Sequence, residues 1–246
     1  MQFDLYSQYY DLIYNSKDYI AEANDVYDRI GLTNPKLLEL GCGSGGHASV
    51  LSKLGCTITG LDLSQSMVDL ANKKEIPNFI SIQANIEHFD LEEKYDAAIS
   101  MFHVMSYLNE NDSIMNCLDC VHHHLKPGGV FIFDFWFAPA VYHQGFESRT
   151  KTIENAEIKV TRNSKTILDI SKNIGIVEFD ILVESKINKS QTKRITEQHP
   201  MRFFSIPEIQ FFANQSGFRV IDFFDLHSNN KPSLETWAIS VKLVKQ

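Results

Sequence analysis

A glycine-rich loop between an apolar run and a helical pattern limits the folds open to this chain more than any other feature. The loop is ELGCGSGG at residues 39–46; it follows a strand predicted over 36–40 and precedes a helix that extends to Leu54. Glycines allow a tight backbone turn and let a ligand approach the main chain. The order strand, glycine loop, helix predicts the first unit of an open α/β sheet, with a ligand site at the carboxyl ends of its strands.

The same alternation of strand and helix continues to about residue 137. Further strands are predicted at 57–61, 79–83, 95–100 and 130–135, and helices at 64–73 and 112–125. Strands separated by helices of this length form βαβ units, which build a parallel sheet covered by helices on both faces. The expected fold class is therefore α/β.

The second half of the chain follows a different pattern. Four strands are expected there without helices between them, at 157–162, 166–174, 176–187 and 192–202, with a turn or bulge at Gly175. They predict an antiparallel β insertion after the fifth strand of the sheet. A helix at 205–216, with Ser205 as its N-cap, and two closing strands at 219–226 and 235–244 complete the pattern.

The charge balance and the hydropathy pattern disfavour several classes of function. The formal net charge is −8, whereas a nucleic-acid-binding surface is positive. No run reaches the roughly 18 apolar residues that span a bilayer, and residues 1–10 lack the pattern of a signal peptide. A cytoplasmic protein that binds neither nucleic acid nor a membrane is expected, with its four cysteines reduced.

Cysteines and histidines gather in one predicted helix without the spacing of a metal site. Cys117, Cys120 and three histidines at 122–124 all lie at 112–125, and no second ligand pair follows at zinc-finger spacing. No metal site is predicted, and the two cysteines are expected to be small core residues.

Two carboxylates beside the glycine loop indicate what it binds. Asp62 ends the second predicted strand, where it can accept hydrogen bonds from a ribose diol. The loop also matches the G-x-G-x-x-G dinucleotide pattern through Gly41, Gly43 and Gly46. Glu39, however, would repel a pyrophosphate and suits a cation such as a sulfonium or an ammonium group. An NAD(P)-dependent reductase and a turn without a ligand stay open as alternatives at this point.

Four motifs, in sequence order, resemble those of the class I S-adenosylmethionine (SAM)-dependent methyltransferases. They are ELGCGSG at 39–45, GLDLSQSM at 60–67, YDAAI at 95–99 and LKPGGVF at 125–131. The resemblance covers about residues 35–135 and implies a Rossmann-like fold with a seven-stranded, mostly parallel sheet whose last strand is antiparallel. It also implies an enzyme that transfers a methyl group from SAM and leaves S-adenosylhomocysteine (SAH).

On this resemblance the chain is interpreted as a single methyltransferase domain, 1–246, with four parts. An N-terminal helical lid occupies 1–34 and the SAM-binding core occupies 35–137. An antiparallel β cap over the acceptor site follows at 138–204, and 205–246 returns to the core.

The family's roles, carried over by position, predict the SAM site. Glu39 would face the amino group, Asp62 would hold the ribose hydroxyls and Met67 would pack on adenine. Asn85 stands where the family commonly has an acid, and it keeps an acceptor oxygen for the adenine amino group. The predicted cofactor-binding residues are Tyr10, Tyr14, Tyr19, Glu39, Gly41, Cys42, Gly43, Gly45, Asp62, Leu63, Met67, Ala84, Asn85, Ile86, Met101 and Phe102.

Four shorter segments suggest a subgroup. YYDLIY at 9–14, followed by KDY at 17–19, is similar to nucleotide-sugar N-methyltransferases and to glycine N-methyltransferase-like enzymes. FHVMSY at 102–107 and FDFWF at 133–137 resemble small-molecule methyltransferases found with surface-polysaccharide genes. The implied acceptor is a small polar metabolite such as an amino sugar or a nucleotide-linked sugar.

Methylation of other acceptors is the alternative to methylation of an amino sugar or a nucleotide-linked sugar. O-methylation of another small metabolite, phosphorylated or carboxylate-bearing, is the main alternative. Protein or nucleic-acid methylation is disfavoured, because SMFH at 100–103 stands where an Asn/Asp-Pro-Pro-Tyr signature would be expected. A monomer or a homodimer is expected.

Candidate acceptor-site residues follow the fourth and fifth strands and end the insertion. His103 and Tyr107 are the predicted catalytic residues; each either contacts the acceptor or shapes the pocket. Asp134 is either solvated in the pocket or structural, because a buried carboxylate needs a partner. The predicted substrate-binding residues are Trp136, Tyr142, His199 and Arg202.

Overall fold

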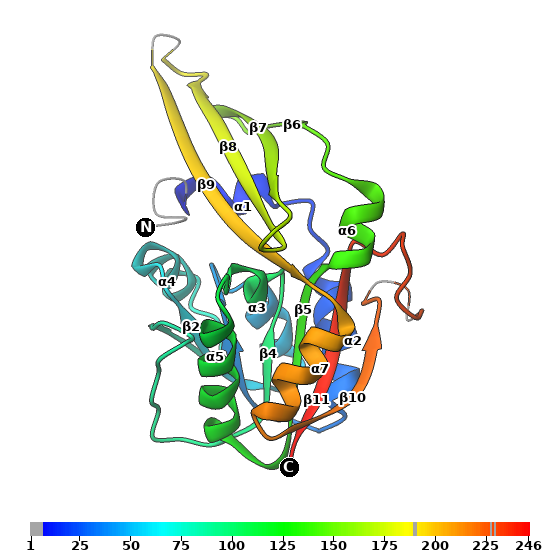
Figure 1. The fold of residues 1–246 in the computed structure, drawn as a ribbon. Coiled ribbons are helices and arrows are strands. Elements are labelled where there is room, and N and C mark those ends of the chain that lie inside the picture. The colour runs from blue at the N-terminus through cyan, green and yellow to red at the C-terminus, as the bar shows by residue number, and fades with distance from the viewer. Residues whose placement is uncertain (1–6, 189–190, 227, 229) are drawn as a thin grey trace.

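Seven strands form the central sheet of the computed structural model, which describes residues 7–188, 191–226, 228 and 230–246 (Figure 1). Residues 1–6 of the predicted lid thus lie outside the described residues. The sheet order is β3-β2-β1-β4-β5-β11-β10, and β11 runs antiparallel to β5 and β10 while the pairs from β3 to β5 are parallel. This confirms the predicted Rossmann-like sheet. The strands are β1 (Lys36–Leu40), β2 (Thr57–Asp62), β3 (Phe79–Gln83), β4 (Tyr95–Ser100), β5 (Leu125–Phe137), β10 (Phe218–Phe224) and β11 (Ala238–Lys245).

Helices cover both faces of this sheet (Figure 1). One face carries α2 (Tyr19–Ile30), α3 (Gly46–Lys53) and α4 (Gln65–Lys73), and the other carries α5 (Asn111–His124) and α7 (Ile206–Gln215). Side chains alternate along a strand, so Leu37 packs with α2 and α3 while Leu38 and Leu40 pack with α5 and α7. Glu39 therefore points to the α2–α3 side.

A four-stranded antiparallel sheet extends from the carboxyl ends of the core strands (Figure 1). We call residues 138–204 the cap. Its strands are β6 (Arg149–Glu154), β7 (Ile158–Asp169), β8 (Ile174–Ser185) and β9 (Thr192–Phe204). The end of β9 pairs in parallel with the end of β5, with Trp136 opposite Phe203 and Phe137 opposite Phe204. This pairing fixes the cap above the core.

The N-terminal helix joins the cap to the core. On α1 (Ser7–Ile13), Tyr10 and Ile13 pack with Val160, Ile181 and Ile195 of the cap and with Met67 of α4. Lys151 of β6 donates to the Ile13 carbonyl over 2.6 Å.

A short 3₁₀ helix, η1 (Val104–Tyr107), follows β4. Among the described residues, no helix is both long and apolar enough to cross a membrane.

The cap differs in detail from the pattern expected from the sequence. Gly175 lies within β8, opposite Met201, and the chain turns at residues 170–173 instead. A Cβ at this glycine would lie 2.8 Å from the Phe146 ring, so Gly175 marks a close approach rather than a turn. Neither β6 nor α6 (Ala138–Gln144) was expected, because β6 is an exposed, charged edge strand and α6 has only seven residues.

Candidate active site

A cavity of about 690 Å³ lies between the carboxyl ends of the core strands, the N-terminal helices and the cap. This volume is within the range of about 300–1,000 Å³ typical of small-molecule sites. Most of the residues predicted from the sequence line it. Those predicted to bind the cofactor are Tyr10, Tyr14, Tyr19, Gly41, Cys42, Gly43, Asp62, Leu63, Met67, Asn85, Ile86, Met101 and Phe102, and those predicted near the acceptor are His103, Tyr107 and Trp136.

Three predicted cofactor residues lie below the cavity surface. Glu39 is only 2% exposed beneath the glycine loop. A Cβ at Gly45 would lie 2.9 Å from the Ile76 side chain, so this glycine serves packing. Ala84 packs against the core cluster and its N–H donates to the Asp62 carbonyl over 2.9 Å.

Three residues predicted to bind the acceptor do not line the cavity. Tyr142 is half-exposed on α6 and donates to Asn173 over 2.7 Å. Arg202 lies on the face of β9 opposite to His199. There its guanidinium donates to Asn111 over 2.8 Å and lies 3.4 Å from Glu208. His199 is on the inner face of β9, but it is fully buried behind Tyr107. Side chains alternate along β9, which accounts for the different directions of His199 and Arg202.

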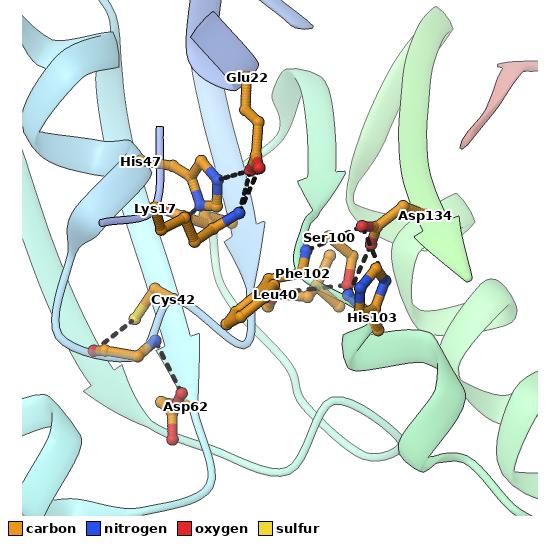
Figure 2. Close-up of polar contacts among 12 residues, drawn as sticks. Lys17, Glu22, Leu40, Cys42, His47, Asp62, Ser100, Phe102, His103 and Asp134 are labelled. Carbon is orange, nitrogen blue, oxygen red and sulfur yellow. Dashed lines mark hydrogen bonds and ion pairs between the residues drawn. The ribbon is translucent and has the colours of Figure 1, made fainter. Parts of the chain in front are cut away.

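The glycine loop presents its backbone to the cavity at Gly43. This residue has a φ of +53°, and a Cβ built on it meets no atom within 4 Å. Its N–H donates to Asp62 over 2.8 Å (Figure 2). The other oxygen of Asp62 accepts from the Ser64 N–H over 2.9 Å. These two bonds fix the carboxylate at the end of β2, and a carboxylate has lone pairs for further donors.

A buried carboxylate lies under the loop without a full set of partners. Oε2 of Glu39 has no hydrogen-bond partner among the described residues, and Oε1 is 3.7 Å from Nδ1 of His47. Burial, together with the charge of Asp62, raises the pKa of Glu39 to about 8. A cation bound next to this carboxylate would therefore favour its charged form.

The carboxylate of Glu22, beside the loop, links the N-terminal helices to the core through hydrogen bonds and ion pairs. Glu22 of α2 pairs with Lys17 and accepts from Nε2 of His47 over 2.8 Å (Figure 2). Burial opposes ionisation of Glu22, but His47 and Lys17 outweigh it and lower its pKa to about 2. Asp11 of α1 accepts from the Ser44 hydroxyl of the loop over 2.5 Å. Helix α1 is thus bonded to the loop itself.

Aromatic rings form one wall of the cavity. The Tyr10 and Tyr14 ring centroids lie 4.6 Å apart, and Tyr14 meets Phe102 edge-on at 5.2 Å. Tyr19 also lies edge-on to His47 at 4.9 Å. Ring faces attract cations and exclude water, so this wall suits a positively charged ligand.

The turn after β4 is held in an unusual conformation by Asp134. Phe102 and His103 have φ values of +68° and +65°, which non-glycine residues rarely adopt. Their N–H groups donate to Asp134 over 3.2 and 2.7 Å, and His103 Nδ1 lies 3.1 Å from the same carboxylate (Figure 2). Asp134 is therefore structural, and it directs both side chains toward the cavity.

The inner face of the cap adds polar residues that were missed in the sequence. Arg149, Arg162, Ser164 and Thr166 line the cavity. Arg162 donates to the Tyr14 hydroxyl over 2.9 Å, and its guanidinium lies 4.8 Å from the centre of the Phe179 ring. The exposed Arg149 side chain has no hydrogen bond or ion pair with another described residue. Period-two alternation from Val160 to Thr166 could have found Arg162, had these residues been assigned to one strand.

His124 of α5 has a structural hydrogen-bond partner at each ring nitrogen. His124 Nδ1 bonds to the Cys120 carbonyl over 2.7 Å, and Nε2 accepts from the Leu91 N–H over 2.8 Å. Cys117 is buried in the core. In the described part of the chain, no three His, Cys, Asp or Glu side chains lie close enough to hold a metal ion.

Comparison with known proteins identifies the family. Residues 37–129 match a methyltransferase domain family. The chain is 31% identical over 170 residues to dTDP-3-amino-3,4,6-trideoxy-alpha-D-glucopyranose N,N-dimethyltransferase of Streptomyces venezuelae, a match that covers 67% of this chain and 68% of that enzyme. The chain belongs to the class I SAM-dependent methyltransferases. As a methyltransferase of this family, it uses SAM as its cofactor.

Solved structures share the fold over nearly the whole methyltransferase. Streptomyces venezuelae DesVI aligns with a TM-score of 0.80 at 24% identity, covering 97% of this chain and 98% of that one. SAM-bound CalS10, an amino pentose methyltransferase from Micromonospora echinaspora, aligns with a TM-score of 0.76 at 20% identity, covering 100% and 98%. The cap and the N-terminal helices are therefore part of the shared fold.

The residues at the loop fit SAM. The open backbone at Gly43 leaves room for a ligand against the main chain, and the carboxylate of Asp62 is fixed at the cavity surface. The unpartnered oxygen of Glu39 and the aromatic wall match a ligand that carries two positive centres, an ammonium and a sulfonium.

Proposed function

We propose that this methyltransferase methylates the amino nitrogen of a small, nucleotide-linked amino sugar. One observation carries the proposal: a single cavity extends from the glycine loop to two arginines on the inner face of the cap. A site for SAM alone would not need that cationic end. The Streptomyces venezuelae relative, named as a dTDP-amino-sugar N,N-dimethyltransferase, supports the same acceptor class.

We assign the loop end of the cavity to SAM. Gly43 lets the methionine and ribose approach the backbone, Asp62 accepts from the ribose hydroxyls, and Met67 packs on the adenine. Asn85 faces the adenine edge; its Oδ1 already accepts from the Glu87 N–H over 3.0 Å and has a second lone pair. Glu39 is assigned to the ammonium group, which would complete its hydrogen bonding.

We assign the cap end to the acceptor. Guanidinium groups bind phosphate oxygens in a bidentate manner, so Arg149 and Arg162 suit the diphosphate of a nucleotide-linked sugar. Trp136, which is edge-on to Trp237 at 5.5 Å, provides an apolar surface for a sugar ring. The lid and the cap would then enclose both ligands.

Between the two ends, the protein has to align the reacting groups. When bound, SAM supplies a methyl group on a sulfonium, and an in-line displacement needs the acceptor nitrogen about 3 Å away. Tyr14 and Phe102 exclude water from this position. The acceptor amine must be neutral to react, and His103 and Tyr107 line the cavity where its proton would leave.

A matched set of acceptors tests the proposal. The protein would be incubated with SAM and a nucleotide-diphosphate-linked amino sugar, the same amino sugar without the nucleotide, or the linked sugar with a hydroxyl in place of the amine. SAH should form with the first acceptor and far more slowly with the others. Equal rates with the hydroxyl analogue would overturn N-methylation in favour of O-methylation, and equal rates with the unlinked sugar would overturn phosphate recognition.

A further inference from the structure

Three side chains are hydrogen-bonded in a line behind the cavity wall. The Tyr107 hydroxyl lies 3.1 Å from Nδ1 of His199, and Nε2 of His199 lies 3.1 Å from Oε2 of Glu197. Tyr107 lines the cavity, whereas His199 is fully buried and the Glu197 side chain is only 6% exposed. The line thus runs from the cavity surface into the protein interior.

The fold explains why these residues meet. Glu197, His199 and Met201 alternate along β9 and share the inner face of the cap. The Phe179 ring of β8 covers His199 at a centroid distance of 4.9 Å. Tyr107 is placed by η1, which follows the turn that Asp134 holds.

The contacts with Glu197 and Tyr107 fit one neutral tautomer of His199. A carboxylate only accepts, so Glu197 requires a proton on Nε2 of His199. Nδ1 of the neutral ring then has a lone pair directed at the Tyr107 hydroxyl. This is the arrangement in which a carboxylate orients a histidine to take a proton from a hydroxyl.

Other charged and titratable groups surround Tyr107. Tyr10 approaches from α1 and Tyr14 from the turn that follows it. Arg162 bonds to Tyr14 from β7, and His103 precedes η1 beside Asp134. Burial, reinforced by Tyr14 and Glu197, raises the pKa of Tyr107 well above its ordinary value. A free phenolate is therefore not a stable state, and the hydroxyl can only pass a proton on.

We propose that Tyr107, His199 and Glu197 form a proton relay that deprotonates the ammonium group of the acceptor, a role that rests on the proposed amine acceptor. The N–H bond of the ammonium breaks as an O–H bond forms on Tyr107, whose own proton moves to Nδ1 of His199. The products are a neutral amine and an imidazolium stabilised by Glu197. After product release, the proton returns through Tyr107 to water in the cavity. His199 and Glu197 are positioning residues that act through Tyr107.

The pH dependence of kcat/KM tests the relay. Tyr107→Phe and Glu197→Gln should each lower kcat/KM by about a hundredfold below the pKa of the acceptor ammonium. Above that pKa the amine arrives neutral, so both variants should approach the wild-type value. SAM affinity, measured by calorimetry, should not change. Thr196→Ala, on the outer face of β9, is the matched control and should follow the wild type at every pH. Equal losses at all pH values, or none, would overturn the relay.

A second measurement does not depend on the acceptor. Nitrogen NMR of histidine-labelled protein should show His199 with its proton on Nε2 in the wild type. Glu197→Gln should alter this signal, and Tyr107→Phe should shift Nδ1. A proton on Nδ1 in the neutral wild-type ring would overturn the relay even if the acceptor proved to be an amine. Failure of the wild type to methylate any amine, with the Nε2 proton in place, would instead overturn the proposed function and the ammonium as the relay's proton source.

Discussion

Gly41 and Gly43 occupy similar places in the loop sequence and have different requirements in the structure. A Cβ at Gly41 would lie 2.4 Å from the Val104 side chain, so protein packing demands this glycine. A Cβ at Gly43 would point into open cavity. The first glycine therefore builds the loop, and the second leaves room for the ligand.

Gly43→Val should abolish SAM binding while the protein stays folded. A side chain at a positive φ costs about 1–2 kcal/mol, and the rest of the effect should fall on the ligand. Gly128→Val is the matched control, because Gly128 also has a positive φ, with open space around it, and lies outside the cavity. Calorimetry with SAM and thermal unfolding of both variants make the comparison. Normal SAM affinity in Gly43→Val would place the cofactor elsewhere.

Glu39 should make the stability of the SAM-free protein depend on pH. The folded state holds a proton with a pKa of about 8, whereas the ordinary value is 4.5. The folded protein thus binds more protons than the unfolded chain between these values, so the free energy of unfolding should fall as pH rises through that window. Glu39→Gln should remove this slope and weaken SAM binding about tenfold or more. Thermal unfolding against pH and calorimetry check both effects; unchanged SAM affinity would mean that Glu39 does not meet the ammonium group.

At the scale of elements, the cap should control recognition of the acceptor while the core holds the cofactor. Arg149→Ala should raise the KM for a nucleotide-linked acceptor about tenfold or more, because a charged hydrogen bond is worth about 1.5–3 kcal/mol. SAM affinity should stay the same. Arg194→Ala is the control, since Arg194 pairs with Asp180 on the exposed side of the cap. Equal changes in KM for the two variants would remove Arg149 from the acceptor site.

The core elements could be predicted from the sequence because their signals are local. Apolar runs, the glycine loop and a serine N-cap such as Ser205, whose side chain accepts from Glu208, each mark a boundary within a few residues. The cap depends on pairing between distant strands, which sets the direction of each side chain. Arg202 and His199 were therefore grouped together in the sequence, although β9 sends them to opposite faces. Arg162 was missed for the same reason.

At the scale of the whole molecule, three parts of the chain meet around one cavity. The core supplies the loop and Asp62, the N-terminal helices supply the aromatic wall, and the cap supplies the arginines and the histidine behind Tyr107. Two hydrogen bonds join the three parts directly: the Ser44 hydroxyl of the loop donates to Asp11, and Arg162 of the cap donates to the Tyr14 hydroxyl. In the proposed function, this arrangement encloses SAM and the acceptor together, which methyl transfer requires.

The position of the transferred methyl group distinguishes an amino-sugar N-methyltransferase from the alternatives. The protein would be supplied with SAM carrying an isotope-labelled methyl group and with a nucleotide-linked amino sugar, and the product would be examined by NMR and mass spectrometry. We expect the labelled methyl group on the amino nitrogen of the sugar, with SAH formed in equal amount. A labelled methyl group on a sugar oxygen, or SAM binding without transfer to any amine, would contradict this expectation.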